Sequence, residues 1–276
     1  MIREPNFAGK FYAGNKEDLI NQIEDSIKSK FGPGKISPLN VYLKQNIGII
    51  VPHAGYQFSS PLQAWGYSSV AKIGRPKIVI LIGPNHSGLG EDVSIYNKGK
   101  WKTPLGETEV NEFFANRIIN ESDGLIKSNF IAHEYEHSLE VQLPFLQYFF
   151  GNEFEIIPIT ILNQKKENII KIANVLKHIF NDKDFLFVFS SDLNHYESKK
   201  RTYYKDELFI NELTNKGDIY SICRKNDISV CGLGPIEIGC LLFNEVEILK
   251  HITSGDVINY DDQTVGYLSA LFIDYK

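Results

Sequence analysis

Three short apolar runs in this chain each end in a polar segment that contains a histidine. The runs occupy residues 47–51, 78–82 and 185–189, and the histidines that follow them are His53, His86 and His195. Apolar runs of this length are typical of strands that are buried on both faces, as in a parallel sheet. The carboxyl ends of parallel strands lie at one edge of an α/β sheet, where ligands bind. We therefore expect one site, of the metal-binding kind, built from three strand ends.

The rest of the chain alternates between helical and strand patterns. Residues 167–180, for example, have apolar side chains at helical spacing directly after another apolar run. This alternation predicts an α/β protein. We also expect a helix over 108–119, and a short hairpin between 93–96 and the segment around Trp101. No internal repeat, low-complexity tract or long linker interrupts the sequence, which predicts a single domain over residues 1–276.

Charge and hydropathy exclude several classes of partner. The formal net charge is −5, and acidic and basic residues are interspersed, so no basic block indicates nucleic-acid binding. The longest apolar runs are far shorter than the roughly 20 residues that a membrane-spanning helix needs. The first residues lack the apolar segment of a signal peptide, so we expect a cytoplasmic protein. The cysteines Cys223, Cys231 and Cys240 are odd in number, which favours reduced thiols.

His53 and His86 are candidates for ligation of a metal ion. His53 precedes Ala54 and Gly55, which permit close backbone approach, and His86 lies in a turn-rich loop. Cys231 comes before a Gly-Leu-Gly-Pro turn, and a helix that begins there would lower the pKa of the thiol and favour the thiolate, a metal ligand and nucleophile. Taken singly, each histidine fits a hydrogen-bonded structural residue and the cysteine a small buried side chain. The coincidence of strand ends favours ligation by the histidines.

Asp192 and His195 are candidates for proton transfer. They lie three positions apart after one strand, so both can face the same cavity if the loop turns into a helix. His195 would then act as a general acid or base, with Asp192 orienting it or binding substrate. The alternative is that Asp192 caps the following helix.

Two other kinds of active site fit parts of the sequence less well. His133-Glu-Tyr-Glu-His137 matches zinc metalloprotease patterns, but the helical period becomes clear only after Ser138. That chemistry needs both histidines on one helical face, so we expect His137 at most to line the cleft. Ser190, Asp192 and His195 contain the residue types of a serine hydrolase, but no Gly-x-Ser-x-Gly elbow is present.

Further motifs follow one another along the chain. They are Arg3-Glu-Pro-Asn-Phe-Ala-Gly-Lys-Phe-Tyr12, Pro52-His-Ala-Gly-Tyr56, Gly83-Pro-Asn-His86, Trp101-Lys-Thr-Pro-Leu-Gly106, Glu136-His-Ser-Leu-Glu-Val-Gln-Leu-Pro-Phe-Leu146, Ser190-Ser-Asp-Leu-Asn-His-Tyr196 and Cys231-Gly. In this order they resemble the motifs of the Memo family, named after a mediator of cell motility, and the match runs nearly end to end. The resemblance implies a three-layer α/β/α fold with a central, mostly parallel or mixed sheet, like that of the class III extradiol dioxygenases of the LigB type.

The resemblance also implies roles for particular residues. By motif, His53, His86 and Cys231 would bind the metal, where the dioxygenases use two histidines and a glutamate for non-haem iron. His195 would match the dioxygenase acid/base histidine, with Asp192 beside it. Some family members are described as binding copper or iron, and prokaryotic ones are linked to AMMECR1-like and radical-SAM protein partners. A thiolate is softer than a carboxylate, so zinc is a further candidate metal and dioxygenase activity does not follow from the fold.

Three hypotheses about function remain open at this point. The first is a metal-binding protein with a redox or metal-handling role. The second is a dioxygenase-like oxidoreductase, dependent on non-haem iron, that acts on a small aromatic substrate. The third is a peptide-binding or protein-binding module without catalysis that uses the same cleft. The candidates to line that cleft are His137, Tyr56, Asn85, Trp101 and Tyr196.

Overall fold

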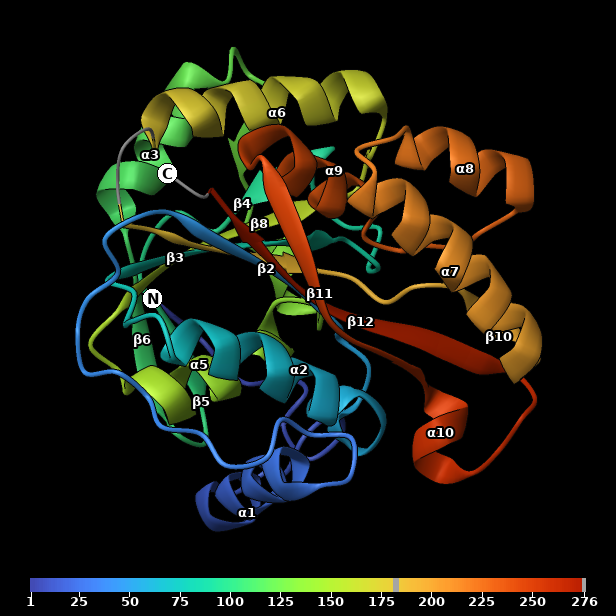
Figure 1. Cartoon of the computed structure of the whole chain (residues 1–276). Coiled ribbons are helices and arrows are strands. Elements are labelled where there is room, and N and C mark those ends of the chain that lie inside the picture. The colour runs from blue at the N-terminus through green and yellow to red at the C-terminus, as the bar shows by residue number, and fades with distance from the viewer. Residues whose placement is uncertain (181–183, 275–276) are drawn as a thin grey trace.

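A computed structural model describes residues 1–180 and 184–274, and it contains a large mixed sheet between layers of helices (Figure 1). The strands are β1 (Ile2–Arg3), β2 (Ile47–Val51), β3 (Ile78–Pro84), β4 (Val93–Ile95), β5 (Lys100–Thr103), β6 (Gly106–Val110), β7 (Ile126–Ser128), β8 (Glu155–Ile161), β9 (Leu186–Ser190), β10 (His195–Glu197), β11 (Glu245–Thr253) and β12 (Thr264–Ile273). The helices are α1 (Lys16–Lys28), α2 (Tyr56–Ala71), α3 (Glu112–Glu121), α4 (Ile131–Glu134), α5 (Leu143–Phe150), α6 (Lys166–Ile179), α7 (Lys199–Thr214), α8 (Ile219–Asn226), α9 (Leu233–Leu242) and α10 (Ser254–Ile258), with a 3-10 turn at Glu140–Gln142.

The centre of the sheet is parallel, and its order brings the three expected strand ends together. The main path runs β1-β5-β6-β8-β3-β9-β2-β12-β10. The pairs from β6 to β2 are parallel, whereas β12 pairs antiparallel with β2, β10 and β11. Because β9 lies between β3 and β2, the segments that follow these strands leave the sheet side by side at its carboxyl edge. The predicted α/β fold with a mixed, largely parallel central sheet is confirmed.

Alternating side chains of the central strands bury both faces of the sheet. Ile50 and Phe189 pack in one core with residues of α6 and α9, whereas Ile49 and Val188 pack in a second core with residues of α1, α2 and α5. These residues are fully buried, which explains why the strands read as continuous apolar runs and not as alternating ones. Figure 1 shows α1, α2 and α5 on one side of the sheet, and α3, α6 and α9 on the other.

Two expected elements differ from the structure. The predicted hairpin between 93–96 and the segment around Trp101 is wrong, because β4 pairs with β7 and β8, and the hairpin joins β5 to β6. The helix expected over 108–119 begins later, since Thr108 belongs to β6 and α3 starts at Glu112. Asn111 caps this helix, and its side chain accepts a hydrogen bond from the backbone N–H of Phe114 at 2.9 Å.

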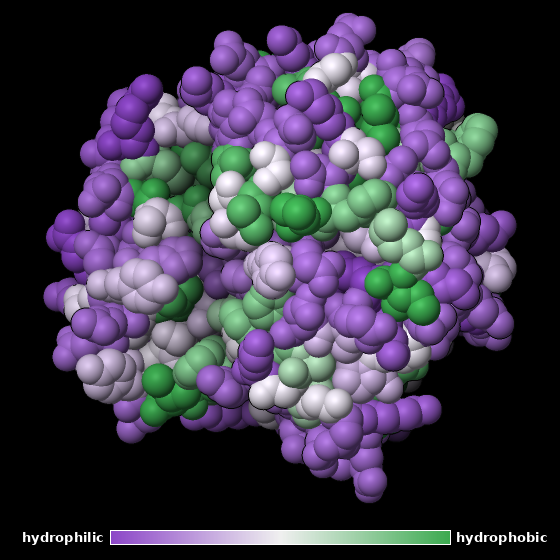
Figure 2. Space-filling model, turned by 180° about the vertical axis from the view of Figure 1, so that it is seen from behind, coloured by the Kyte–Doolittle hydropathy of each residue, from purple (hydrophilic) through white to green (hydrophobic). Residues whose placement is uncertain are grey.

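Among residues 1–180 and 184–274, no helix has both the length and the apolar character needed to cross a bilayer. Figure 2 shows one face of the molecule, which is mostly hydrophilic with hydrophobic residues in several separate groups. Cys223, Cys231 and Cys240 are free thiols.

Candidate metal centre

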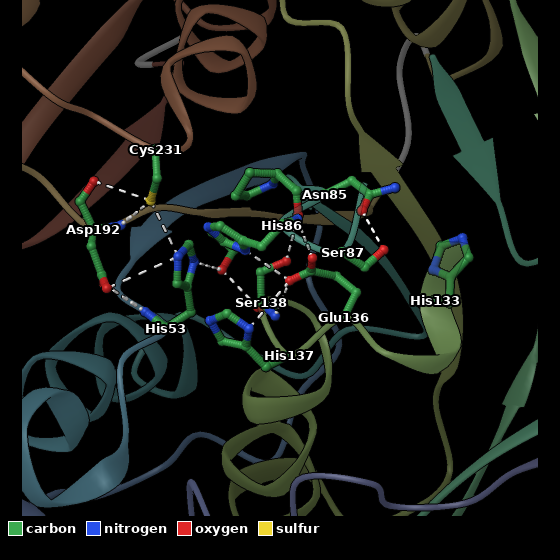
Figure 3. A network of polar contacts seen from close by, with 12 residues as sticks. His53, Asn85, His86, Ser87, His133, Glu136, His137, Ser138, Asp192 and Cys231 are labelled. Carbon is green, nitrogen blue, oxygen red and sulfur yellow. Dashed lines mark hydrogen bonds and ion pairs between the residues drawn. The ribbon is translucent and has the colours of Figure 1, made fainter. Parts of the chain in front are cut away.

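Three imidazoles converge at the carboxyl edge of the parallel strands (Figure 3). His53 follows β2, His86 follows β3, and His137 comes from the segment between α4 and α5. One ligand nitrogen from each of the three rings lies within 4.8 Å of the others. His137, expected only to line the cleft, is therefore part of the cluster.

The hydrogen bonds of Ser190 fix the protonation of the His53 ring. Ser190 Oγ lies 2.7 Å from the carbonyl oxygen of Ser138 and 2.8 Å from His53 Nδ1, and Gln142 Nε2 donates to it at 3.0 Å. A carbonyl oxygen can only accept, so the single hydroxyl proton of Ser190 goes to Ser138. Ser190 therefore accepts from His53 Nδ1–H, and Nε2 of His53 is left as the unprotonated ring nitrogen. Burial, and then the charge of His86, lower the pKa of this imidazole well below its ordinary value.

The buried carboxylate of Glu136 orients the ring of His86 through a hydrogen bond at Nδ1, as Ser190 does for His53. Glu136 Oε1 lies 3.0 Å from Nδ1 of His86, and the other oxygen of Glu136 accepts from the backbone N–H of His86. Burial alone would raise the pKa of Glu136, but the hydrogen bond and charge of His86 outweigh it and lower that pKa to about 2. Burial would lower the pKa of His86, and the same contacts outweigh it and raise that pKa. Nδ1 of His86 is thus occupied, and Nε2 remains available to a ligand.

His137 stacks on His86, with ring centroids 4.8 Å apart and an interplanar angle of 22°. Burial, followed by the charge of His53, lowers the pKa of His137 to about 3, so the ring is neutral near pH 7. The metalloprotease pattern does not form, because α4 ends at Glu134 and His137 lies beyond it. His133, the other histidine of that pattern, is fully buried against the rings of Tyr96 and Trp101.

A buried arginine from the N-terminal segment holds the loop that carries Glu136 and His137. Arg3 Nη2 donates to the carbonyl oxygens of His133 and Glu136 at 2.7 and 3.1 Å. Its Nη1 lies 2.5 Å from the carboxylate of Glu140, and both side chains are buried. The guanidinium also lies over the Trp101 ring, 4.3 Å from its centroid. The beginning of the chain therefore positions part of the histidine cluster.

Cys231 reaches the cluster from the segment between α8 and α9. Its Sγ lies 3.2 Å from Nε2 of His53, and the backbone N–H of Asp192 points at the sulfur from 3.3 Å. We expected the start of α9 to lower the pKa of the thiol. Burial, and then the charge of Asp192, instead raise the pKa of Cys231 well above its ordinary value. The sulfur also lies 3.6 Å from the carbonyl oxygen of Asp192, so the thiol proton has two possible acceptors, this oxygen and the unprotonated Nε2 of His53.

The segment after β9 does not turn directly into a helix, because His195 begins the strand β10 and α7 begins only at Lys199. Asp192 caps no helix, since α7 begins after Ser198, and its Oδ1 accepts the backbone N–H of His53 at 2.8 Å. Burial raises the pKa of Asp192. His195 starts the short strand β10 and is half-buried, with its Nδ1 2.7 Å from the carbonyl oxygen of Ser229.

The other residues expected to line the cleft have varied positions. Trp101 and Tyr56 are 1% exposed and belong to the hydrophobic core, with the Tyr56 hydroxyl bonded to the Val141 carbonyl. Asn85 shapes the loop of His86, because its Oδ1 accepts from Ser87 and Gly88. Tyr196 is 74% exposed and has a φ of 59°, beside His195.

The donor set fits a transition-metal ion. Neutral imidazole nitrogens whose other ring nitrogen is held by a carboxylate or a hydroxyl are typical of histidine ligands, and thiolate sulfur suits copper, zinc or iron. His53, His86 and His137 would hold the ion, with Cys231 as a further donor next to His53. Such an ion supplies Lewis acidity or redox chemistry when bound.

Fold and site together define an α/β protein with a histidine cluster, flanked by a cysteine, at the carboxyl edge of its parallel strands. A family model described as Memo-like protein matches residues 3–271, and the chain belongs to the Memo family. It is 43% identical over 286 residues to a MEMO1 family protein of Sulfurisphaera tokodaii, covering 99% of this chain and 100% of that protein. It is 42% identical over 277 residues to a MEMO1 family protein of Thermotoga neapolitana, covering 98% and 99%.

A solved structure supports the fold alone. The crystal structure of the uncharacterized protein JW3007 from Escherichia coli K12 superposes with a TM-score of 0.58 at 10% sequence identity. The superposition covers 82% of this chain and 99% of that chain.

Proposed function

We propose that this Memo-family chain binds a transition-metal ion in the cleft and that the ion serves a redox or metal-handling role. His53 and His86 are the central ligands in this proposal, with Cys231 and His137 completing the donor set from either side of His53. The observation that carries it is the pair of oriented imidazoles. Ser190 holds Nδ1 of His53, and Glu136 holds Nδ1 of His86. The Nε2 atom of each ring is therefore the nitrogen that would bind the metal.

Iron and copper are the metals that we favour, with zinc as the third candidate. Imidazole binds all three, and a sulfur donor adds preference for the softer ions. The same sulfur makes the site sensitive to oxidants, because a thiolate can be oxidised to sulfenic acid and beyond.

A second candidate function is an oxidoreductase on a small organic substrate. His195 favours it, because this half-buried imidazole at the start of β10 lies near enough for its charge to lower the pKa of His53, and an imidazole can exchange protons with a substrate. Oxygen uptake in the iron-loaded protein with a panel of catechols tests this candidate. Turnover that disappears in His195→Gln supports it, and the absence of uptake with every metal and substrate counts against it.

Metal analysis of protein purified without an affinity tag tests the main proposal. We expect about one equivalent of metal per chain, lost in a His53→Ala/His86→Ala variant. His178→Ala is the matched control, since His178 lies on α6 with its side chain 75% exposed, and it should retain the metal. Full occupancy in the double variant, or no uptake of iron, copper or zinc by the unaltered chain, would overturn the proposal.

A further inference from the structure

We propose that Asn194 is a positioning residue which, through Ser229, holds His195 with its proton on Nδ1, so that Nε2 is left as the proton-accepting nitrogen of the ring. The inference rests on the proposed function, in which His195 handles a proton. It concerns the orientation of the ring and not the metal ligands, so the two can fail separately.

Ser229 forms hydrogen bonds with both the backbone and the ring of His195. The backbone N–H of His195 donates to Ser229 Oγ at 2.9 Å, and His195 Nδ1 lies 2.7 Å from the carbonyl oxygen of Ser229. A carbonyl oxygen has no proton to give, so Nδ1 must be the protonated nitrogen. Among residues 1–180 and 184–274, Nε2 of His195 has no hydrogen-bond partner, and its lone pair is free.

Asn194 fixes Ser229 in turn. The backbone N–H and the hydroxyl of Ser229 lie 3.2 and 3.3 Å from Asn194 Oδ1. The hydroxyl donates to this amide oxygen and therefore accepts from His195, so both contacts are satisfied with one proton. The orientation of the amide is determined as well, since Nδ2 of Asn194 donates to the carboxylate of Glu197 at 2.8 Å. Asn194 is 1% exposed, which removes competition from water.

Buried charges on α7 anchor this arrangement. The backbone N–H of Asn194 donates to Asp206 at 3.0 Å, and Asp206 lies 2.9 Å from Nε2 of His251. Glu197, which holds the Asn194 amide, pairs with the buried Lys205 at 2.9 Å. Because Asp206 and Lys205 are both buried and paired, the loop between β9 and β10 has little freedom to turn the His195 ring.

The consequence is a defined direction of proton transfer. A water or hydroxyl group that reaches Nε2 can lose its proton to it, with the electron pair of the broken O–H bond staying on oxygen. The product is an imidazolium whose Nδ1–H still donates to the Ser229 carbonyl. With the opposite tautomer, Nε2 would carry a proton and could not accept one.

Nitrogen-15 NMR of the metal-free, full-length protein tests the inference by reading the tautomer of the His195 ring at a pH where it is neutral. We expect the Nδ1–H form to dominate in the unaltered chain and a mixture of tautomers in Asn194→Ala. Ser229→Ala keeps the carbonyl but loses the hydroxyl bridge, and should give an intermediate mixture; it decides the question if Asn194→Ala does not fold. Asn215→Ala is the control, since the exposed Asn215 side chain donates to the carbonyl oxygen of Asn211 in its own helix.

A dominant Nε2–H form in the unaltered protein would overturn the inference, and so would an unchanged tautomer in both loop variants. We expect Asn194→Ala to bind as much metal as the unaltered chain. Loss of metal from that variant without a change of tautomer would assign Asn194 a purely structural role and would also contradict the inference.

Discussion

Nε2 of His53 and Sγ of Cys231 lie 3.2 Å apart, although 178 positions of the chain separate them. The approach depends on Gly232, where an added Cβ would lie 2.5 Å from the carbonyl oxygen of Ser190 and 2.6 Å from Cβ of Ser191. The segment that carries the sulfur therefore packs directly on the end of β9, without room for a side chain.

Gly232→Ala should move the sulfur away from His53. Overpacking of this kind costs about 1–3 kcal/mol of stability, and the backbone must shift to relieve it. With cobalt(II) as the probe metal, we expect the thiolate-to-metal absorption band to be lost or strongly weakened. Gly55→Ala is the matched control near His53, because its Cβ would meet nothing closer than 3.7 Å. A full-strength band in Gly232→Ala would show that Cys231 is not positioned by this contact.

Glu136→Gln should weaken metal binding while leaving the ligands in place. An amide oxygen in the place of Oε1 can still accept from Nδ1 of His86 and from the backbone N–H of Ser138, but the side chain loses the negative charge that makes His86 a better metal ligand. Loss of such a partner typically lowers metal affinity by about 10–100-fold. Competition with a chelator measures the change, and Glu153→Gln, at a carboxylate with a 79% exposed side chain, is the control. Equal affinities of the two variants would argue that Glu136 does not act through His86.

Arg3→Ala should destabilise the fold strongly. The change leaves the buried carboxylate of Glu140 without its cation and removes the guanidinium donors from the carbonyl oxygens of His133 and Glu136. Removal of one partner of a buried ion pair costs about 3–5 kcal/mol. The matched control is Lys102→Ala, because Lys102 pairs with Glu4 at 3.2 Å on the surface, where a pair contributes about 0–1 kcal/mol. Urea unfolding measures both, and similar losses would contradict the anchoring role of Arg3.

Acid should destabilise the metal-free protein through His137 and Glu136. The folded state lowers the pKa of His137 from its ordinary value of 6.5 to about 3 and that of Glu136 from 4.5 to about 2. In the windows from pH 6.5 to 3 and from pH 4.5 to 2, the unfolded state binds more protons, so the free energy of unfolding falls as the pH falls.

Each group adds a slope of up to about 1.4 kcal/mol per pH unit inside its window. Urea unfolding at pH 7 and pH 4 should show a smaller loss in His137→Gln than in the unaltered chain. His178→Gln, at an exposed histidine, should behave like the unaltered chain. Equal losses in all three proteins would mean that His137 is not held neutral by the fold.

The sequence predicts the sheet edge well because apolar runs mark strands that are buried on both faces. His53 and His86 could be placed at strand ends on the same edge of the sheet for this reason. The position of His137 could not, because it depends on Arg3, which binds the loop from more than a hundred residues away. In the sequence, His137 was marked by the motif that begins at Glu136, which does not show where the side chain points. Trp101 shows the reverse difficulty, since an aromatic residue in a motif gives no indication of whether it faces a cleft or, as here, the core.

The helix expected over 108–119 illustrates a limit of periodicity. Thr108 and Val110 face the interior from β6, and their spacing also fits the face of the helix that follows. The true boundary is the cap at Asn111, a local hydrogen bond that outweighs the longer pattern.

X-ray diffraction from crystals loaded with iron, copper or zinc, recorded on both sides of the absorption edge of each metal, tests the central claim most directly. We predict one anomalous peak in the cleft at about 2.1 Å from Nε2 of both His53 and His86. A peak elsewhere on the chain, or a cleft without any peak after loading with all three metals, would contradict the proposal that these imidazoles hold a metal ion.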